Sequence, residues 1–449
     1  MIKIMRNKNI IKDIFILAFP AIAEMALNTL VGVADTIMIG QFIGTEGLSA
    51  VGFANQIIFT LIFIFSSFNA GATAMVARSY GEKNYKKLNK IIGQNMTLNF
   101  IIGIIIYLVT LFYAKDILNI LDISQEVHNM GSSYIRYVAI SQLFMFISFA
   151  AAASLRGSGD TKTPMYITGI ANILNIIGNY LLITGFSIFP EMGIAGAALS
   201  TSIARGIAAV LYLYVLIGGK EKIKLKTENL RVSFYILGPL WNFSYAAAIE
   251  QFFMQVAFFA NGWIVALLST TAEAAFRILI TIESTSFMPA IGISIATATL
   301  VGKRLGEKDP EKSFITGQVA GMLGITWGIF MGILFFIFPE FFLSIFTDDM
   351  KVIDSAIFTM KLVGLNQPLL AFMIVMGGAL RGTGDTKGVM WITSLRLWII
   401  FVPFNYIFVK YFNTGVNGVW YAEILSFLIF TVVIYRRFAA REWANIEMF

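Results

Sequence analysis

Four residues in the first long apolar run are placed to bind a proton or a small cation. Pro20, Glu24, Asn28 and Asp35 follow one another at separations of 4, 4 and 7 residues, which puts them on one face of a helix. Carboxylate and amide oxygens can bind a cation, and a carboxylate in an apolar run can hold a proton. Pro20 removes a helical hydrogen bond, so we predict a hinge there. A packed polar seam between helices is the alternative interpretation.

A later apolar run carries a changed copy of this stripe. Glu250 stands 226 residues after Glu24, Asn261 stands 226 residues after Asp35, and Gln251 directly follows Glu250. The inner acid therefore occurs twice, whereas the outer acid occurs only in the first copy. We predict Asp35, Glu250 and Glu24 as ion-binding residues, and Gln251 and Asn261 as neighbours that line the same cavity.

Amide side chains form a third polar stripe. Asn172, Asn175 and Asn179 are spaced i, i+3 and i+7, which again defines one helical face, and Thr201 in the following run can join them. Such amides can donate hydrogen bonds to a carboxylate or bind a cation through their oxygens. Ordinary hydrogen bonding between helices is the alternative. Arg205, Arg277, Glu283 and Arg396 also lie in apolar runs, and their pattern assigns them no role.

The elements that position these residues belong to an internal duplication. The octapeptide at 155–162, LRGSGDTK, returns as LRGTGDTK at 380–387, and Gly81-Glu82-Lys83 returns as Gly306-Glu307-Lys308 at the same offset. A single offset shared by separated segments indicates two copies of one unit. The glycines of the octapeptide allow a tight turn, and its aspartates, Asp160 and Asp385, can cap the next helix. A direct role in gating is the alternative interpretation.

The composition places the chain in a membrane. Hydrophobic residues make up 57% of the 449 and charged residues only 13%, whereas soluble proteins carry about 25% charge. There is no cysteine, which excludes disulfides and thiolate metal sites, and the single histidine, His128, lies in a polar connector as an ordinary solvated residue. We expect no cofactor, and no metal other than Na⁺ at Asp35 or Glu250.

Twelve apolar runs are long enough to cross the roughly 30 Å hydrocarbon core of a bilayer. They lie at 14–40, 47–77, 91–113, 131–154, 163–186, 193–217, 235–268, 273–301, 314–338, 353–379, 388–411 and 417–435. Six runs in each copy make the two copies parallel repeats. We predict an all-α integral membrane protein with an N-terminal lobe, 1–218, a cytoplasmic linker, 219–233, and a C-terminal lobe, 234–449.

The distribution of positive charge predicts the orientation. Most of the 33 Lys and Arg residues fall at the two ends and in the connectors that follow even-numbered runs. The connectors after odd-numbered runs hold only Lys115, Lys351 and Lys410. Positive loops stay in the cytoplasm, so we expect a multi-pass protein of the cell membrane with both termini inside. The net charge of +7 thus reflects topology, and it does not indicate a nucleic-acid partner.

Together these motifs resemble the multidrug and toxic compound extrusion (MATE) family over essentially the whole chain. The resemblance rests on Pro20 and Asp35-Thr36 in the first run, the repeated Leu-Arg-Gly-x-Gly-Asp-Thr-Lys, Glu250-Gln251, and the segment 283–292, ESTSFMPAIG. It implies a monomeric antiporter, driven by H⁺ or Na⁺, that exports amphipathic, mostly cationic compounds by rocking two lobes. It also implies that Asp35 is a coupling site. Asn179 and Leu370 stand where other family members carry aspartates.

Two other functions share some of these features. A flippase for lipid-linked precursors has the same duplicated architecture, but it handles pyrophosphate and needs a strongly cationic cavity. The polar residues here are acidic or amide. A membrane-embedded enzyme needs a nucleophile, a metal site or a clustered acid–base pair, and no such constellation is present, so no catalytic residue is predicted.

Overall fold

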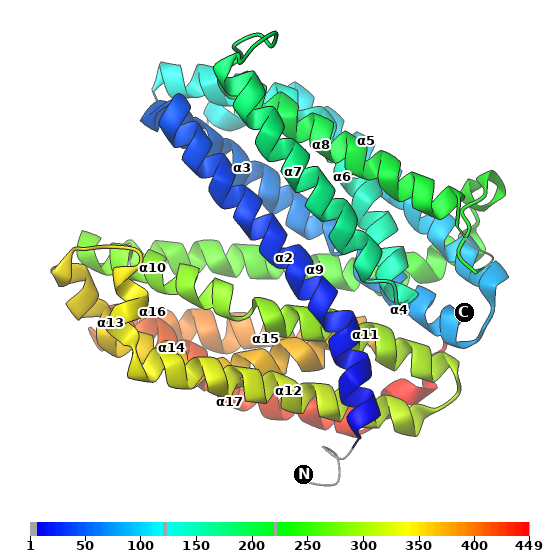
Figure 1. Ribbon diagram of the computed structural model, residues 1–449. Helices are drawn as coiled ribbons and strands as arrows, with labels where there is room; N and C mark the ends of the chain where they lie inside the picture. The colour runs from blue at the N-terminus through cyan, green and yellow to red at the C-terminus, as the bar shows by residue number, and fades with distance from the viewer. Residues whose placement is uncertain (1–6, 120–123, 220–221, 449) are drawn as a thin grey trace. The chain divides into compact units, whose positions relative to one another are not determined.

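The computed structural model describes residues 7–119, 124–219 and 222–448, apart from the side chains at 57 and 114–117, and its regular structure in these ranges is helical (Figure 1). Two positions of the predicted linker, 220–221, lie outside the described residues, as do 1–6, 120–123 and 449. The all-helical architecture confirms the predicted fold class for the part of the chain that is described.

The helices follow the repeat. The first copy forms α2 (Lys8–Phe42), α3 (Thr45–Ser66), α4 (Asn69–Gly81), α5 (Tyr85–Asn119), α6 (Gln125–Gly157), α7 (Lys162–Thr184) and α8 (Ile194–Ile217). A short helix, η1 (Thr227–Leu230), precedes the second copy. The second copy forms α9 (Phe234–Val265), α10 (Thr270–Ser286), α11 (Met288–Gly306), α12 (Pro310–Ile337), α13 (Pro339–Ser344), α14 (Met350–Thr383), α15 (Thr386–Leu395), the π-helical η2 (Arg396–Phe401), α16 (Val402–Lys410), α17 (Asn417–Ala439) and η3 (Glu442–Asn445).

Eleven segments of the described chain are long and apolar enough to cross a membrane. They match the predicted runs except the seventh, 235–268. That run forms α9, which is 32 residues long but carries Glu250, Gln251, Gln255 and Asn261. These polar side chains lower its mean hydropathy. The chain is therefore a multi-pass membrane protein, and α9 is its most polar long helix by design of the same stripe that drew attention in the sequence.

The described chain divides into two compact units whose borders fall inside helices. One unit joins residues 7–22 to Tyr245–Met448, and the other comprises Ala23–Ser244. In the first unit, Ile10, Ile14 and Leu17 at the start of α2 share a buried core with Ala290 and Leu300 of α11. The lobe limits expected from the sequence, 1–218 and 234–449, stay a prediction.

The start of α9 packs in the corresponding way within the unit Ala23–Ser244. The Trp241 ring lies 5.1 Å from the Phe68 ring between centroids. Gly71 on α4 approaches so closely that a Cβ there would lie 2.5 Å from Ser244 Oγ. Each unit therefore includes the beginning of the helix whose remainder belongs to the other unit.

The repeated octapeptide forms the same turn twice. Its second glycine has a positive φ in both copies, 93° at Gly159 and 95° at Gly384, a conformation that glycine adopts without steric cost. Asp160 Oδ1 accepts a hydrogen bond from the backbone N–H of Thr163 at 2.9 Å, and Asp385 Oδ1 accepts one from that of Gly388 at 3.1 Å. The predicted turn and helix-capping roles are confirmed.

The segment between the repeats is tied to α5. Gln94 Nε2 donates to the carbonyl oxygens of Asn229 and Arg231 at 2.9 and 2.8 Å, and its Oε1 accepts from the Ser233 N–H at 2.9 Å. Thr97 Oγ1 donates to the Leu230 carbonyl at 2.9 Å. The described part of the linker is therefore a docked segment, held by side chains of the first repeat.

Candidate functional site

Asp35 lies half-buried on α2 and is held by amide groups from α7. Asn179 Nδ2 donates to Asp35 Oδ1 at 2.6 Å. When the Asn175 amide takes the orientation that satisfies both of its polar atoms, its nitrogen donates to the same oxygen at 2.9 Å. Its oxygen then accepts from Thr201 Oγ1 on α8 at 3.1 Å. The structure thus brings together four residues that the sequence singled out on three separate helices.

The arrangement leaves oxygen atoms available beside the carboxylate. Asn179 is 1% exposed, and its Oδ1 is buried without a hydrogen-bond partner in the described chain. Carboxylate and amide oxygens are the groups that hydrogen-bond a protonated partner or coordinate a hard cation. The pair Asp35–Asn179 can therefore hold H⁺ or Na⁺ at one point within the membrane-spanning helices.

Positive charge reaches Asp35 only from a distance. Arg205 on α8 donates from Nη1 to Ser141 Oγ at 2.8 Å, and its charge acts on Asp35. Within the described residues, no Lys or Arg nitrogen lies within 4.0 Å of the Asp35 carboxylate. Asp35 is therefore stabilised by amides and remains free to exchange its partner.

The second repeat contains the same pair without the charge. Asn405 Nδ2 on α16 donates to Asn261 Oδ1 on α9 at 2.6 Å, and both side chains are buried. Asn261 corresponds to Asp35, and Asn405 stands 226 residues after Asn179. Sequence reasoning found Asn261 but missed Asn405, although the repeat offset pointed to it. The geometry is duplicated, whereas the ionisable group is not.

Glu24 and Glu250 are each paired with the arginine of the repeated octapeptide. Arg156 Nη2 lies 2.6 Å from Glu24 Oε1, and Arg381 Nη2 lies 2.7 Å from Glu250 Oε1. The glutamate side chains are 8% and 5% exposed, so both carboxylates are buried against their arginines. This pairing was not predicted, although equal offsets between the two glutamates and the two arginines carried the signal.

Three other predicted residues lie in varied surroundings. Pro20 is buried inside α2, which continues through it, and it stands two residues before the unit border at Ile22. Asn28 is exposed, and Gln251 is half-buried. The hinge role of Pro20 and the cavity roles of Asn28 and Gln251 stay predictions. Arg277 donates to Glu273 at 2.7 Å on the exposed surface of α10.

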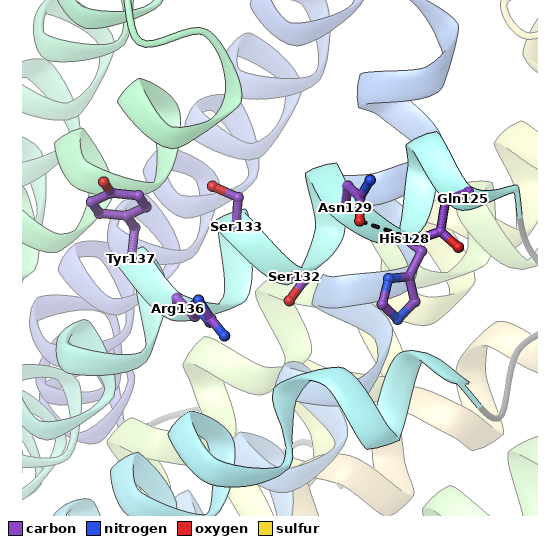
Figure 2. A pocket seen from close by; sticks show the side chains of 7 residues that line it. All are labelled: Gln125, His128, Asn129, Ser132, Ser133, Arg136 and Tyr137. Carbon is purple, nitrogen blue, oxygen red and sulfur yellow. Dashed lines mark hydrogen bonds between the residues drawn. The ribbon is translucent and has the colours of Figure 1, made fainter.

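A separate cavity of about 580 Å³ lies along α6 (Figure 2). The structure lines it with Gln125, His128, Asn129, Ser132, Ser133, Arg136 and Tyr137. Figure 2 shows the hydrogen bond from Gln125 to Asn129, which measures 3.2 Å. His128 is half-buried, and neither ring nitrogen has a partner in the described chain. His128 is therefore less solvated than expected, and none of the predicted site residues lines this cavity.

Comparison with known proteins places this architecture. The MatE family model matches residues 20–181 and again 246–407, which is one match in each repeat. The chain is 33% identical over 443 residues to the "Probable multidrug resistance protein NorM" of Thermotoga maritima, covering 96% of this chain and 93% of that protein. It is 27% identical to the "Uncharacterized transporter YisQ" of Bacillus subtilis, covering 96% and 94%.

Solved structures share the fold. A crystal structure described as MATE in the bent conformation superposes with a TM-score of 0.90 at 20% identity, and the match covers 98% of both chains. An outward-facing multidrug resistance MATE transporter superposes with a TM-score of 0.88, covering 96% of both. The helical arrangement is thus the one found in those structures.

Proposed function

This chain belongs to the MatE family, and on that premise we propose that it exports amphipathic cationic compounds from the cell in exchange for H⁺ or Na⁺. The proposal rests chiefly on one observation. Asp35 is a membrane-embedded carboxylate held by neutral amides, whereas Glu24 and Glu250 are paired with arginines. A carboxylate without a fixed countercharge within the membrane is costly unless it binds an ion.

The relatives support the substrate class. The Thermotoga maritima relative carries the name of a multidrug resistance protein, and it aligns with 96% of this chain. Compounds that differ in shape but share a positive charge are attracted by a carboxylate and accommodated by flexible apolar side chains. The chain has 20 methionines and 41 phenylalanines from which such a binding surface can be built.

Coupling follows from competition between conformations. If the ion and the exported compound bind different states of the protein more tightly, each favours the state that releases the other. Asp35 is the group that distinguishes the two states, since its amide partners lie on α7 and it lies on α2. Pro20, on the same helix, is the predicted hinge between them.

Dye transport tests this proposal. The purified protein in liposomes should move a fluorescent cationic dye when a proton or sodium gradient is imposed, and collapsing that gradient should stop the movement. Separate H⁺ and Na⁺ gradients identify the coupling ion. Movement of anionic lipid-linked precursors without movement of cations would replace this proposal with the flippase.

The proposed location is the cell membrane, with both termini and the repeated turns in the cytoplasm and with the protein acting as a monomer. Because the natural chain has no cysteine, single cysteines can be labelled without background. We expect Lys162→Cys and Lys387→Cys, at exposed and repeat-related positions, to react on intact cells only with membrane-permeant thiol reagents.

Ile188→Cys provides the matched control on the opposite side. Ile188 is 89% exposed in the connector between α7 and α8, so an impermeant reagent should label it on intact cells. If the impermeant reagent labelled position 162 or 387 and spared position 188, the orientation would be reversed.

A further inference from the structure

The second repeat buries a cluster of charged residues apart from the Asp35 site. Glu283 on α10 is 7% exposed. Trp420 Nε1 on α17 donates to Glu283 Oε2 at 3.2 Å, and Gln367 Nε2 on α14 donates to Glu283 Oε1 at 3.4 Å. Ser286 Oγ in turn donates to Gln367 Oε1 at 2.7 Å. The Glu283 carboxylate is thus held by neutral donors from two neighbouring helices.

Two charged groups from other helices act on this carboxylate or on its neighbour. Glu423, which follows Trp420 by three residues on α17, interacts electrostatically with Glu283 and with Arg396. Arg396 begins the π-helical segment η2, donates from Nη1 to Ser426 Oγ at 3.1 Å, and lies 4.2 Å from the centre of the Phe427 ring. π-helical turns often occur at functional sites.

The charges of this cluster do not balance. Glu250 also acts on Arg396, but Arg381 already holds Glu250 at 2.7 Å. Arg396 therefore provides one positive charge against the two carboxylates of Glu283 and Glu423. Neither carboxylate has a Lys or Arg nitrogen within 4.0 Å in the described chain. A net charge of minus one in the low-dielectric interior is unfavourable unless a cation neutralises it.

We propose that Glu283 and Glu423 bind one proton between them and so form a second proton site, located in the second repeat. The proton comes from water and is held by two carboxyl groups that titrate as a pair. It balances the cluster, since one carboxylate is then neutral and the other faces Arg396. This site is independent of the position equivalent to Asp35, which Asn261 occupies in the same repeat.

Asn366 allows the cluster to accommodate both protonation states. It lies on α14 beside Gln367, is completely buried, and acts on Glu283. Its amide nitrogen and oxygen have no hydrogen-bond partner in the described chain. The nitrogen can donate to a carboxylate and the oxygen can accept from a carboxylic acid, so the same side chain serves either form.

Tryptophan fluorescence of the purified protein tests proton binding directly, because the Trp420 indole donates to Glu283. In a pH titration without Na⁺, we expect a reversible change in emission that is lost in Trp420→Phe and in Glu283→Gln. Glutamine keeps an oxygen that can accept from the indole, so the fold should persist. In Glu423→Gln the midpoint should move to lower pH, because one fewer negative charge faces Glu283.

Glu273→Gln is the matched control. Glu273 lies on the same helix but is exposed and paired with Arg277, so its substitution should leave the titration unchanged. An unchanged titration in Glu283→Gln, or an emission change driven by Na⁺ at constant pH, would overturn the proposal. The contribution of this site to coupling rests on the proposed antiport, whereas proton binding does not. Failure of dye transport with an intact titration would therefore reject the antiport alone.

Discussion

Asp35→Asn should fold and insert normally yet lose gradient-driven export down to the background of empty liposomes. Asparagine has nearly the same shape and can still accept the 2.6 Å hydrogen bond from Asn179. It cannot take up a proton, and it binds a cation without the attraction of a negative charge. The measurement is dye efflux under an imposed gradient, with the amount of protein in the membrane determined by immunoblot.

Asn179→Asp is the informative companion variant. It places a second carboxylate beside Asp35, which other members of the family carry by resemblance, so we expect transport to persist with altered pH dependence. If Asp35→Asn transported at the wild-type rate, the aspartate would be removed from the mechanism. Glu250 or Glu24 would then be the coupling residue.

Arg156→Ala and Arg381→Ala should each destabilise the protein strongly. Each variant leaves a glutamate that is 8% or 5% exposed without its countercharge. Removing one partner of a buried ion pair costs about 3–5 kcal/mol, and less where the pair is partly exposed, as the arginines are here. Thermal unfolding of the purified protein in detergent should show the loss as a lower midpoint.

Removal of both partners separates structure from coupling. The double variant Glu24→Gln with Arg156→Gln should regain most of the lost stability, since no unpaired charge remains, and Glu250→Gln with Arg381→Gln should do the same. Stable double variants that transport normally would confine Glu24 and Glu250 to a structural role. Stable double variants without transport would place that glutamate in the coupling mechanism, and a double variant no more stable than the single one would contradict the pairing.

The duplication made much of this architecture predictable. One offset, seen in the octapeptide and in Glu24 and Glu250, was enough to expect two similar halves, because the apolar runs fell into register at the same offset. Asp35, Asn175, Asn179 and Thr201 were also identified from helical spacing. Spacing reports which side chains share a face of one helix, and polar faces within a membrane tend to meet one another.

Contacts between non-equivalent positions could not be predicted in this way. Glu283, Glu423 and Arg396 lie on three different elements and share no offset with acids or bases in the first repeat. Their meeting depends on how those helices cross. The π-helical turn at Arg396 depends on backbone hydrogen-bond register, which hydrophobic periodicity does not report.

The sharing of α2 and α9 bears on how a single copy of the repeat could exist. Ile10, Ile14 and Leu17 at the start of α2 are buried by helices of the second copy, so one copy alone would leave them without a partner. Two separate copies could bury these faces by exchanging their first helical segments, which is a domain-swapped dimer. Joining the copies in one polypeptide makes that exchange intramolecular and independent of dilution. The chain is in this sense a swapped dimer made covalent, and a gene fragment that encodes either half should not fold by itself.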